Sequence, residues 1–103
     1  MNVSSILRSK GTHVETARGG ICLAEAARRL CERGVGSLVI TDEQGEPLGV
    51  LSERDLVRAF AGHGAEALDL PAQAALGGPP VTCAPQDSIR KVRSLMTTRR
   101  ARH

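Results

Sequence analysis

The sequence predicts an α/β (α+β) fold in which a small β-sheet packs against two helices per unit, in the order β-α-β-β-α. Two short apolar runs, 37–41 and 47–51, flank an acidic turn, as the strands of a β-hairpin do. A helical pattern begins directly after this hairpin, at Ser52. An earlier helix is indicated by apolar and small residues that recur along one face: Leu23, Ala26, Ala27, Leu30 and Cys31.

The residues ahead of that earlier helix predict two short elements. An amphipathic lead-in helix over residues 1–10 is indicated by apolar residues at helical spacing: Val3, Ile6 and Leu7. A short strand is expected around residues 13–16. Gly34 is expected to end the helix that follows, because glycine readily takes the left-handed conformation found after helix ends.

The helix that begins at Ser52 is expected to run to Ala61. Its inward face is expected to carry its large apolar residues: Leu56, Val57 and Phe60. Its outward face is expected to carry two arginines: Arg54 and Arg58. The Ala-rich residues 65–80 close with two glycines and two prolines, so we expect a linker there between two copies of the same unit.

The two copies become visible when the chain is compared with itself at a shift of 66 residues. Thr16 then matches Thr82, and Leu23 matches Ile89. Both segments predict a short strand followed by an amphipathic helix, but His103 falls where the second hairpin should begin. We therefore expect an incomplete second copy, with residues beyond those given. Its helix has an apolar face that needs a covering partner: Ile89, Val92, Leu95 and Met96.

Composition limits the class of protein. A chain of 103 residues suits one compact domain, or two small repeats that share a core. Phe60 is the only aromatic residue, so the core must be aliphatic, and no aromatic platform exists for stacking bases. The net charge of +3 is concentrated in residues 86–103, which hold six Lys or Arg and one Asp. A basic excess on one helical segment is typical of a solvated helix face, so we expect no nucleic-acid partner.

No pattern in the sequence indicates a catalytic or metal site. The three cysteines lack Cys-x-x-Cys spacing and are expected to be free, buried thiols: Cys22, Cys31 and Cys83. The three histidines lack the spacing of metal ligands: His13, His63 and His103. Without a secretory leader or a run of about 18 apolar residues, we expect no membrane span and a cytoplasmic location.

Three segments together resemble the CBS domain, the regulatory module named after cystathionine β-synthase: residues 23–36, 39–42 and 49–57. The resemblance implies that copies come in pairs, called Bateman modules, which act in signal transduction or metabolic control and catalyse no reaction. It also implies the division of the chain. We expect a lead-in helix at 1–10, a first copy at 11–64, a linker at 65–80 and a partial second copy at 81–103, with its strand and first helix only.

The resemblance also implies a ligand that contains adenosine: AMP, ADP, ATP, NADH or S-adenosylmethionine. In the family, the Ser or Thr and the Asp of a Gly-h-x-Ser/Thr-x-x-Asp pattern (h apolar) meet the ribose and phosphate region, and Gly49 to Asp55 carries this pattern. An ionised Asp55 can accept hydrogen bonds from a ribose diol, each contributing on the order of 1.5–3 kcal/mol. The N–H groups at the start of the Ser52 helix suit a phosphate.

Other residues are expected to complete this site. Gly49 lets a ligand approach the strand end, and Arg54 assists from the rim. Adenine is expected to pack on Val50 and Leu51. The first strand of the second copy is expected to contribute two contacts: Thr82 and Cys83.

The same residues permit other interpretations. Ser-x-x-Asp is also a helix-capping arrangement, in which the serine accepts from a backbone N–H and the acid reaches back. With that role alone, the chain would be a ligand-free interaction module that dimerises through its apolar helix faces. A homodimer is expected with or without a ligand. A third alternative is a DNA-binding regulator that uses Arg90 to Arg102.

Overall fold

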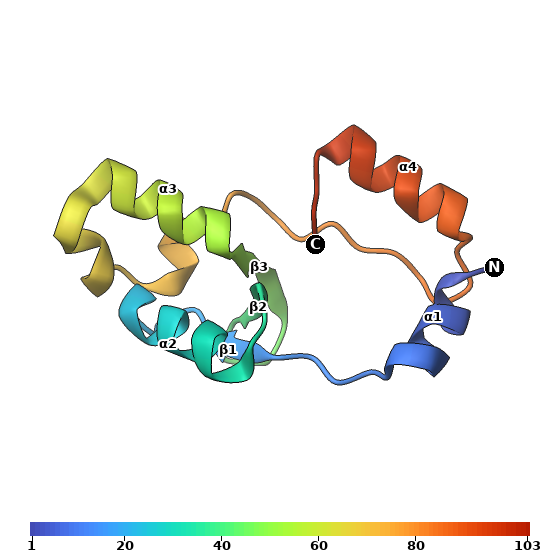
Figure 1. Cartoon of the computed structure of the whole chain (residues 1–103), viewed down its shortest axis with the longest axis horizontal. Coiled ribbons are helices and arrows are strands. Elements are labelled where there is room, and N and C mark those ends of the chain that lie inside the picture. The colour runs from blue at the N-terminus through green and yellow to red at the C-terminus, as the bar shows by residue number, and fades with distance from the viewer. The chain divides into compact units, whose positions relative to one another are not determined.

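The computed structural model describes residues 1–103 and contains one three-stranded sheet and four α-helices, which confirms the mixed α and β class. The elements follow in this order (Figure 1): α1 (Val3–Lys10), β1 (Thr16–Arg18), α2 (Leu23–Arg33), β2 (Ser37–Thr41), β3 (Pro47–Ser52), α3 (Glu53–His63), the 3-10 helices η1 (Gly64–Asp69) and η2 (Ala72–Ala75), and α4 (Ile89–Arg99). The chain forms two compact units. Unit 1 combines Met1–His13 with Val81–His103, and unit 2 is Val14–Pro80.

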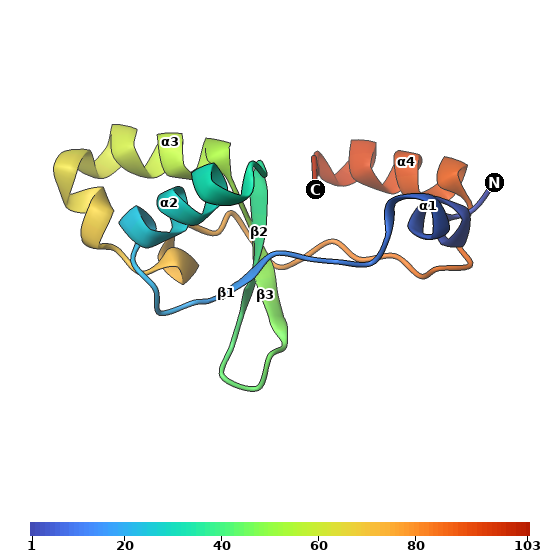
Figure 2. The same ribbon diagram turned by 60° about the horizontal axis from the view of Figure 1, so that its bottom comes forward.

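The sheet of unit 2 has the strand order β1-β2-β3 (Figure 2). β1 runs parallel to β2, and α2 forms the crossover between them. β2 and β3 are antiparallel, with Leu38 opposite Leu51, which confirms the predicted hairpin. Asp42 holds the turn, because its Oδ1 accepts hydrogen bonds from the N–H groups of Gln44 and Glu46, each at 2.9 Å. The register of this hairpin places Ser52, the last residue of β3, opposite Ser37.

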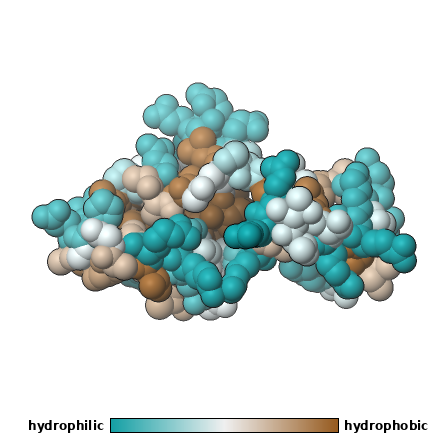
Figure 3. Space-filling model, turned by 90° about the horizontal axis from the view of Figure 1, so that it is seen from above, coloured by the Kyte–Doolittle hydropathy of each residue, from teal (hydrophilic) through white to brown (hydrophobic).

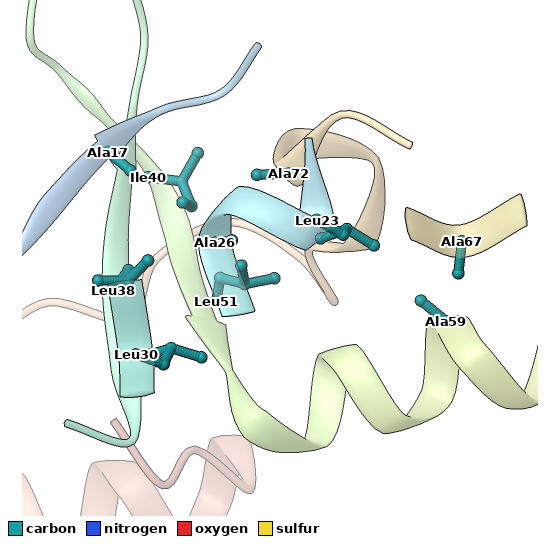
Figure 4. Packing of buried hydrophobic residues seen from close by; sticks show 10 residues of the cluster. All are labelled: Ala17, Leu23, Ala26, Leu30, Leu38, Ile40, Leu51, Ala59, Ala67 and Ala72. Carbon is teal, nitrogen blue, oxygen red and sulfur yellow. The ribbon is translucent and has the colours of Figure 1, made fainter. Parts of the chain in front are cut away.

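The core of unit 2 is aliphatic, as the composition predicts. Figure 4 shows side chains from the sheet, from α2, from α3 and from both 3-10 helices converging on one cluster. The largest fully buried side chains all come from the hairpin: Leu38, Ile40 and Leu51. α2 adds three buried residues at helical spacing: Leu23, Ala26 and Leu30. Gly34 ends α2 in the left-handed conformation, with φ of 64°, as expected.

The segment after α3 takes part in this core. Ala67 of η1 and Ala72 of η2 are buried. The N–H of Ala72 donates to the carbonyl of Ile21 at 2.7 Å, and the N–H of Leu23 donates to the carbonyl of Leu70 at 2.9 Å. Residues 64–75 therefore help to close unit 2 around α2. The boundaries proposed for the two copies and their linker stay a prediction.

The rotation of α3 differs from the expected one. Val57 and Phe60 are 68% and 50% exposed, so the prediction that they face the core is wrong. The residues of α3 that face inward are Asp55 and Ala59, with Leu56 packed partly against the core. The small Ala59 fits closely against the core, whereas Phe60 lies on the adjacent, solvent-facing side. Figure 3 shows hydrophobic residues among the hydrophilic ones on the face of the molecule seen there.

Three further expectations need correction. β1 begins at Thr16 instead of residue 13, because its partners are Val39 to Thr41. Residues 81–83 do not form a strand, since no sheet of unit 1 is there to pair with them. The cysteines are free, but Cys31 and Cys83 are exposed and Cys22 is only half-buried.

Unit 1 joins its two chain segments through backbone hydrogen bonds. The N–H groups of Val3 and Ser4 donate to the carbonyls of Asp87 and Pro85, at 3.0 and 2.8 Å. Ser88 caps α4 by accepting from the N–H of Lys91. Neither α1 nor α4 contains a buried residue, and the apolar face predicted for α4 is only half-buried.

The carboxylate of Asp87 stabilises the start of α4 and leads to a prediction of pH dependence. The backbone N–H of Ala84 and the side chain of Lys91 hold the pKa of Asp87 below its ordinary value of 3.8. Because the pKa of Asp87 is lower in the folded state, the ionised carboxylate makes its full contribution to stability above pH 3.8. This contribution is lost as the pH falls toward the pKa of the folded state. We expect the NMR signals of residues 84–91 to broaden or shift in this window. Asp87→Asn should remove that dependence, and an unchanged pH response of the variant would contradict the assignment.

Candidate functional site

The candidate site lies where β3 passes into α3. Leu51 is fully buried in the core and anchors the end of the strand. Ser52 keeps an extended backbone, with φ of −110° and ψ of 167°, and is the N-cap of α3. Because Asp55 lies three residues into the helix, its side chain returns toward Ser52. The hydroxyl and the carboxylate singled out in the sequence are therefore brought together.

Ser52 and Asp55 form a complete capping box, which confirms the capping interpretation. The Ser52 N–H and Oγ both donate to Asp55 Oδ2, at 2.8 and 3.0 Å. The Asp55 N–H donates in return to Ser52 Oγ, at 3.4 Å. These bonds satisfy backbone groups that the start of a helix would otherwise leave unpaired.

The capping box leads to a stability prediction. Ser52→Ala should lower the free energy of unfolding by about 1 kcal/mol, since the Asp55 N–H and one lone pair of the carboxylate lose their partner. Urea denaturation followed by circular dichroism measures this change. The control is Ser94→Ala, which removes an exposed hydroxyl from the interior of α4. Equal stability of the Ser52 variant and the natural protein would contradict the capping role.

The second oxygen of Asp55 is held by an arginine. Arg58 Nη1 donates to Asp55 Oδ1 at 2.9 Å, and the spacing of three residues along α3 makes this contact possible. Asp55 is only 7% exposed, whereas the Arg58 side chain is 65% exposed. Both carboxylate oxygens of Asp55 therefore accept hydrogen bonds from the protein itself. Sequence reasoning placed Arg58 in solvent and missed this contact, although the spacing Asp-x-x-Arg was a signal for it.

The chain's own residues 76–78 cover one side of the site. A Cβ atom placed on Gly49 would lie 3.0 Å from the Gly78 carbonyl oxygen and 3.2 Å from Leu76 Cδ1. A Cβ atom on Gly77 would lie 3.9 Å from Arg58 Nη1 and 4.0 Å from Asp55 Oδ1. The absence of a side chain at Gly49 thus admits a segment of the same unit. The expected role of Gly49 toward a ligand stays a prediction.

The remaining predicted residues differ in their access to solvent. Val50 is half-buried, while Leu51 points to the opposite face of β3 and lies in the core. Arg54 is exposed on the first turn of α3. Thr82 and Cys83 are exposed and belong to unit 1. The structure thus brings Ser52 and Asp55 together within unit 2, and the contributions of Gly49, Thr82 and Cys83 to a ligand site stay a prediction.

A pocket of about 410 Å³ lies at the other end of the sheet, where β1 and β2 finish. Its lining combines a glycine turn with charged and polar side chains: Arg18, Gly19, Gly20, Thr41, Asp42, Glu43 and Gln73. No predicted ligand-binding residue belongs to it. Its polar groups are already used in part, since Asp42 holds the hairpin turn and Thr41 donates to the carbonyl of Ala17 at 3.5 Å.

No three side chains among His, Cys, Asp and Glu are grouped so that they could hold a metal ion. None of the helices combines the length and the apolar character that crossing a bilayer requires.

Comparison with known proteins shows which family this chain is similar to. The model of the CBS domain matches residues 23–62. The crystal structure of a CBS-domain containing protein from Agrobacterium tumefaciens is 34% identical and has a TM-score of 0.90, with 96% of this chain and 74% of that chain covered. A CBS domain protein from Pyrobaculum aerophilum, solved in complex with AMP, is 25% identical with a TM-score of 0.82, over 97% of this chain and 73% of that chain.

Two curated relatives, both uncharacterized, are longer than the matched region. A protein of Acidianus ambivalens is 40% identical over 48 residues, which are 47% of this chain and 29% of the relative. A protein of Methanopyrus kandleri is 31% identical over 86 residues, which are 84% of this chain and 41% of the relative. The chain therefore spans less than half the length of either one.

Proposed function

This chain belongs to the CBS-domain family, and on that premise we propose that it is a regulatory module that binds an adenine nucleotide where β3 meets α3 and passes the occupancy to a partner or to a second copy. The observation that carries the proposal is a nearly buried carboxylate at the start of a helix, held in position by Ser52 and paired with an exposed arginine. The AMP complex of the Pyrobaculum aerophilum protein supports the choice of ligand.

The proposal gives each group a role. Asp55 Oδ1 accepts from the ribose hydroxyls, while Oδ2 stays in the capping box. Two N–H groups of the first turn of α3 are already used: Glu53 donates to the Gly36 carbonyl, and Asp55 donates to Ser52 Oγ. The N–H of Arg54 is then the donor of that turn available to a phosphate. Val50 packs against the base.

Isothermal titration calorimetry of the purified protein tests the proposal. The probes are AMP, ADP, ATP, NADH and S-adenosylmethionine, each titrated separately. We expect saturable binding of at least one of them, with a stoichiometry of no more than one per chain, because a single Gly-h-x-Ser-x-x-Asp motif is present. Absence of binding by all five would overturn the nucleotide-sensing role.

A ligand-free interaction module is the second candidate. The capping box favours it, because Ser52 and Asp55 already have a complete structural role without a ligand. The half-buried apolar face of α4 would then contribute to a homodimer. Thermal denaturation separates the two candidates, since a ligand that binds only the folded state raises the melting temperature as its concentration rises. A melting temperature unaffected by every nucleotide, together with dimers in light scattering, would favour the interaction module.

A further inference from the structure

Arg58 lies at the point where a ligand would have to reach Asp55. Its Nη1 atom is 2.9 Å from Asp55 Oδ1, and the main chain at Gly77 passes beside both groups. The carboxylate is nearly buried, whereas most of the Arg58 side chain is in solvent. The guanidinium group is therefore exposed and bonded to one oxygen of a carboxylate that is otherwise enclosed by the protein.

The hydrogen-bonding capacity of Asp55 determines what a ligand must displace. A carboxylate oxygen has two lone pairs, and Oδ2 already accepts from the N–H and the hydroxyl of Ser52. Oδ1 accepts one bond, from Arg58, so one position remains. A vicinal diol that donates two hydrogen bonds needs both positions on Oδ1. Such a ligand can bind fully only if Arg58 leaves.

A displaced Arg58 remains positively charged, since a guanidinium does not lose its proton in proteins. Breaking its bond to Asp55 costs free energy unless the ligand supplies another anion. A phosphate on the same ligand does so, because guanidinium and phosphate match in a bidentate geometry. A nucleoside without phosphate offers the diol but leaves the arginine without a partner.

We propose that Arg58 is a specificity-determining residue, which exchanges Asp55 for the phosphate of the bound ligand and so selects nucleoside phosphates over nucleosides. This inference rests on the proposed function of the same site. The exposed length of the Arg58 side chain permits the exchange without a change in α3. The neighbouring segment 76–78 presents only main chain and one leucine to the pair, so it offers no competing anionic side chain.

Arg28 on α2 provides a matched control. Its side chain is 64% exposed and is paired with Glu25 three residues earlier, so it matches Arg58 in charge, exposure and spacing but has no part in the candidate site. If general electrostatic attraction of the phosphate explained a preference for nucleotides, removing either arginine would have a similar effect. If the exchange explains it, only Arg58 should change the discrimination between nucleotide and nucleoside.

The test is calorimetric titration of AMP and of adenosine into the natural protein, Arg58→Met, Arg58→Lys and Arg28→Met. We expect the natural protein to prefer AMP, and Arg58→Met to reduce the ratio of the two affinities by about ten-fold, the effect of roughly one charge-assisted bond. This reduction should combine weaker AMP binding with stronger adenosine binding, because Asp55 Oδ1 is then open. Arg58→Lys should retain part of the preference, and Arg28→Met should retain it fully. Circular dichroism melting checks that the variants fold.

The outcomes separate this inference from the proposed function. Binding of neither compound by the natural protein overturns both. Binding with an unchanged affinity ratio in Arg58→Met leaves the nucleotide site standing and overturns the role of Arg58. An equal loss of preference in Arg28→Met also overturns it, because the preference would then come from the general positive charge of the protein.

Discussion

Asp55→Asn is expected to weaken binding of the nucleotide by about ten-fold or more, because each hydrogen bond to a charged acceptor contributes on the order of 1.5–3 kcal/mol and 1.4 kcal/mol is a factor of ten. An asparagine has only one acceptor oxygen. If that oxygen faces Ser52, the NH₂ group meets the ribose hydroxyls, and if it faces the ribose, the NH₂ group meets two donors of Ser52. Either orientation loses bonds that the carboxylate makes. Calorimetric titration of the nucleotide that binds most tightly measures the change.

Glu53→Gln is the control for this experiment. It removes the same charge two residues earlier on α3, from an exposed position outside the capping box. We expect its affinity to stay within about two-fold of the natural value, since exposed charges contribute little. Undiminished binding by Asp55→Asn would show that the ribose does not meet this carboxylate. A loss of equal size in both variants would indicate general electrostatics instead.

Leu51→Ala is expected to lower the free energy of unfolding by about 2–5 kcal/mol, the range for large-to-small substitutions in a core. Leu51 is 0% exposed and lies opposite Leu38 across the hairpin, in the cluster that includes Ile40. Unit 2 has few large side chains in its core, so few atoms can move to fill the cavity that Leu51→Ala leaves. Because small proteins are stable by only about 5–15 kcal/mol, a substantial part of the stability would be lost. Urea denaturation followed by circular dichroism measures it.

Val50→Ala is the matched control on the same strand. Val50 faces the opposite side of β3 and is half-buried, so we expect a loss clearly below that of Leu51→Ala. Similar losses in the two variants would contradict the placement of the core on the Leu51 face. This pair also shows which apolar side chain is accessible to a ligand, because only Val50 can be shortened without opening the core.

On α3 the predicted helix is present, but the face that meets the core differs from the predicted one. Apolar spacing predicted the helix itself, and the Ser-x-x-Asp pattern predicted its capping box. The same spacing placed Val57 and Phe60 in the core, and both are exposed. Spacing defines a face of a helix but not which face meets the sheet. That choice follows from the direction in which β3 enters the helix and from the small side chain of Ala59, which allows close packing.

The residues around Asp55 also divide into contacts that the sequence predicted and contacts that it did not. The local pattern was sufficient for Gly49, Ser52 and Asp55, since neighbours in sequence are necessarily close in space. The approach of residues 76–78 to Gly49 was not predictable, because these residues lie more than 20 positions away and no local signal links them. The bond between Arg58 and Asp55 was within reach of sequence reasoning, but its importance depends on the burial of the carboxylate, which the surrounding unit imposes.

The sequence by itself determined the elements of this protein, its family resemblance and the hydroxyl and carboxylate at the start of α3, because capping, turns and periodicity act over a few residues. Only the tertiary structure decided that Asp55 is nearly buried and that both of its oxygens accept hydrogen bonds, Oδ2 from Ser52 and Oδ1 from Arg58. The physical reason is that desolvation and hydrogen-bond saturation are properties of the packed surroundings, which segments distant in the chain supply.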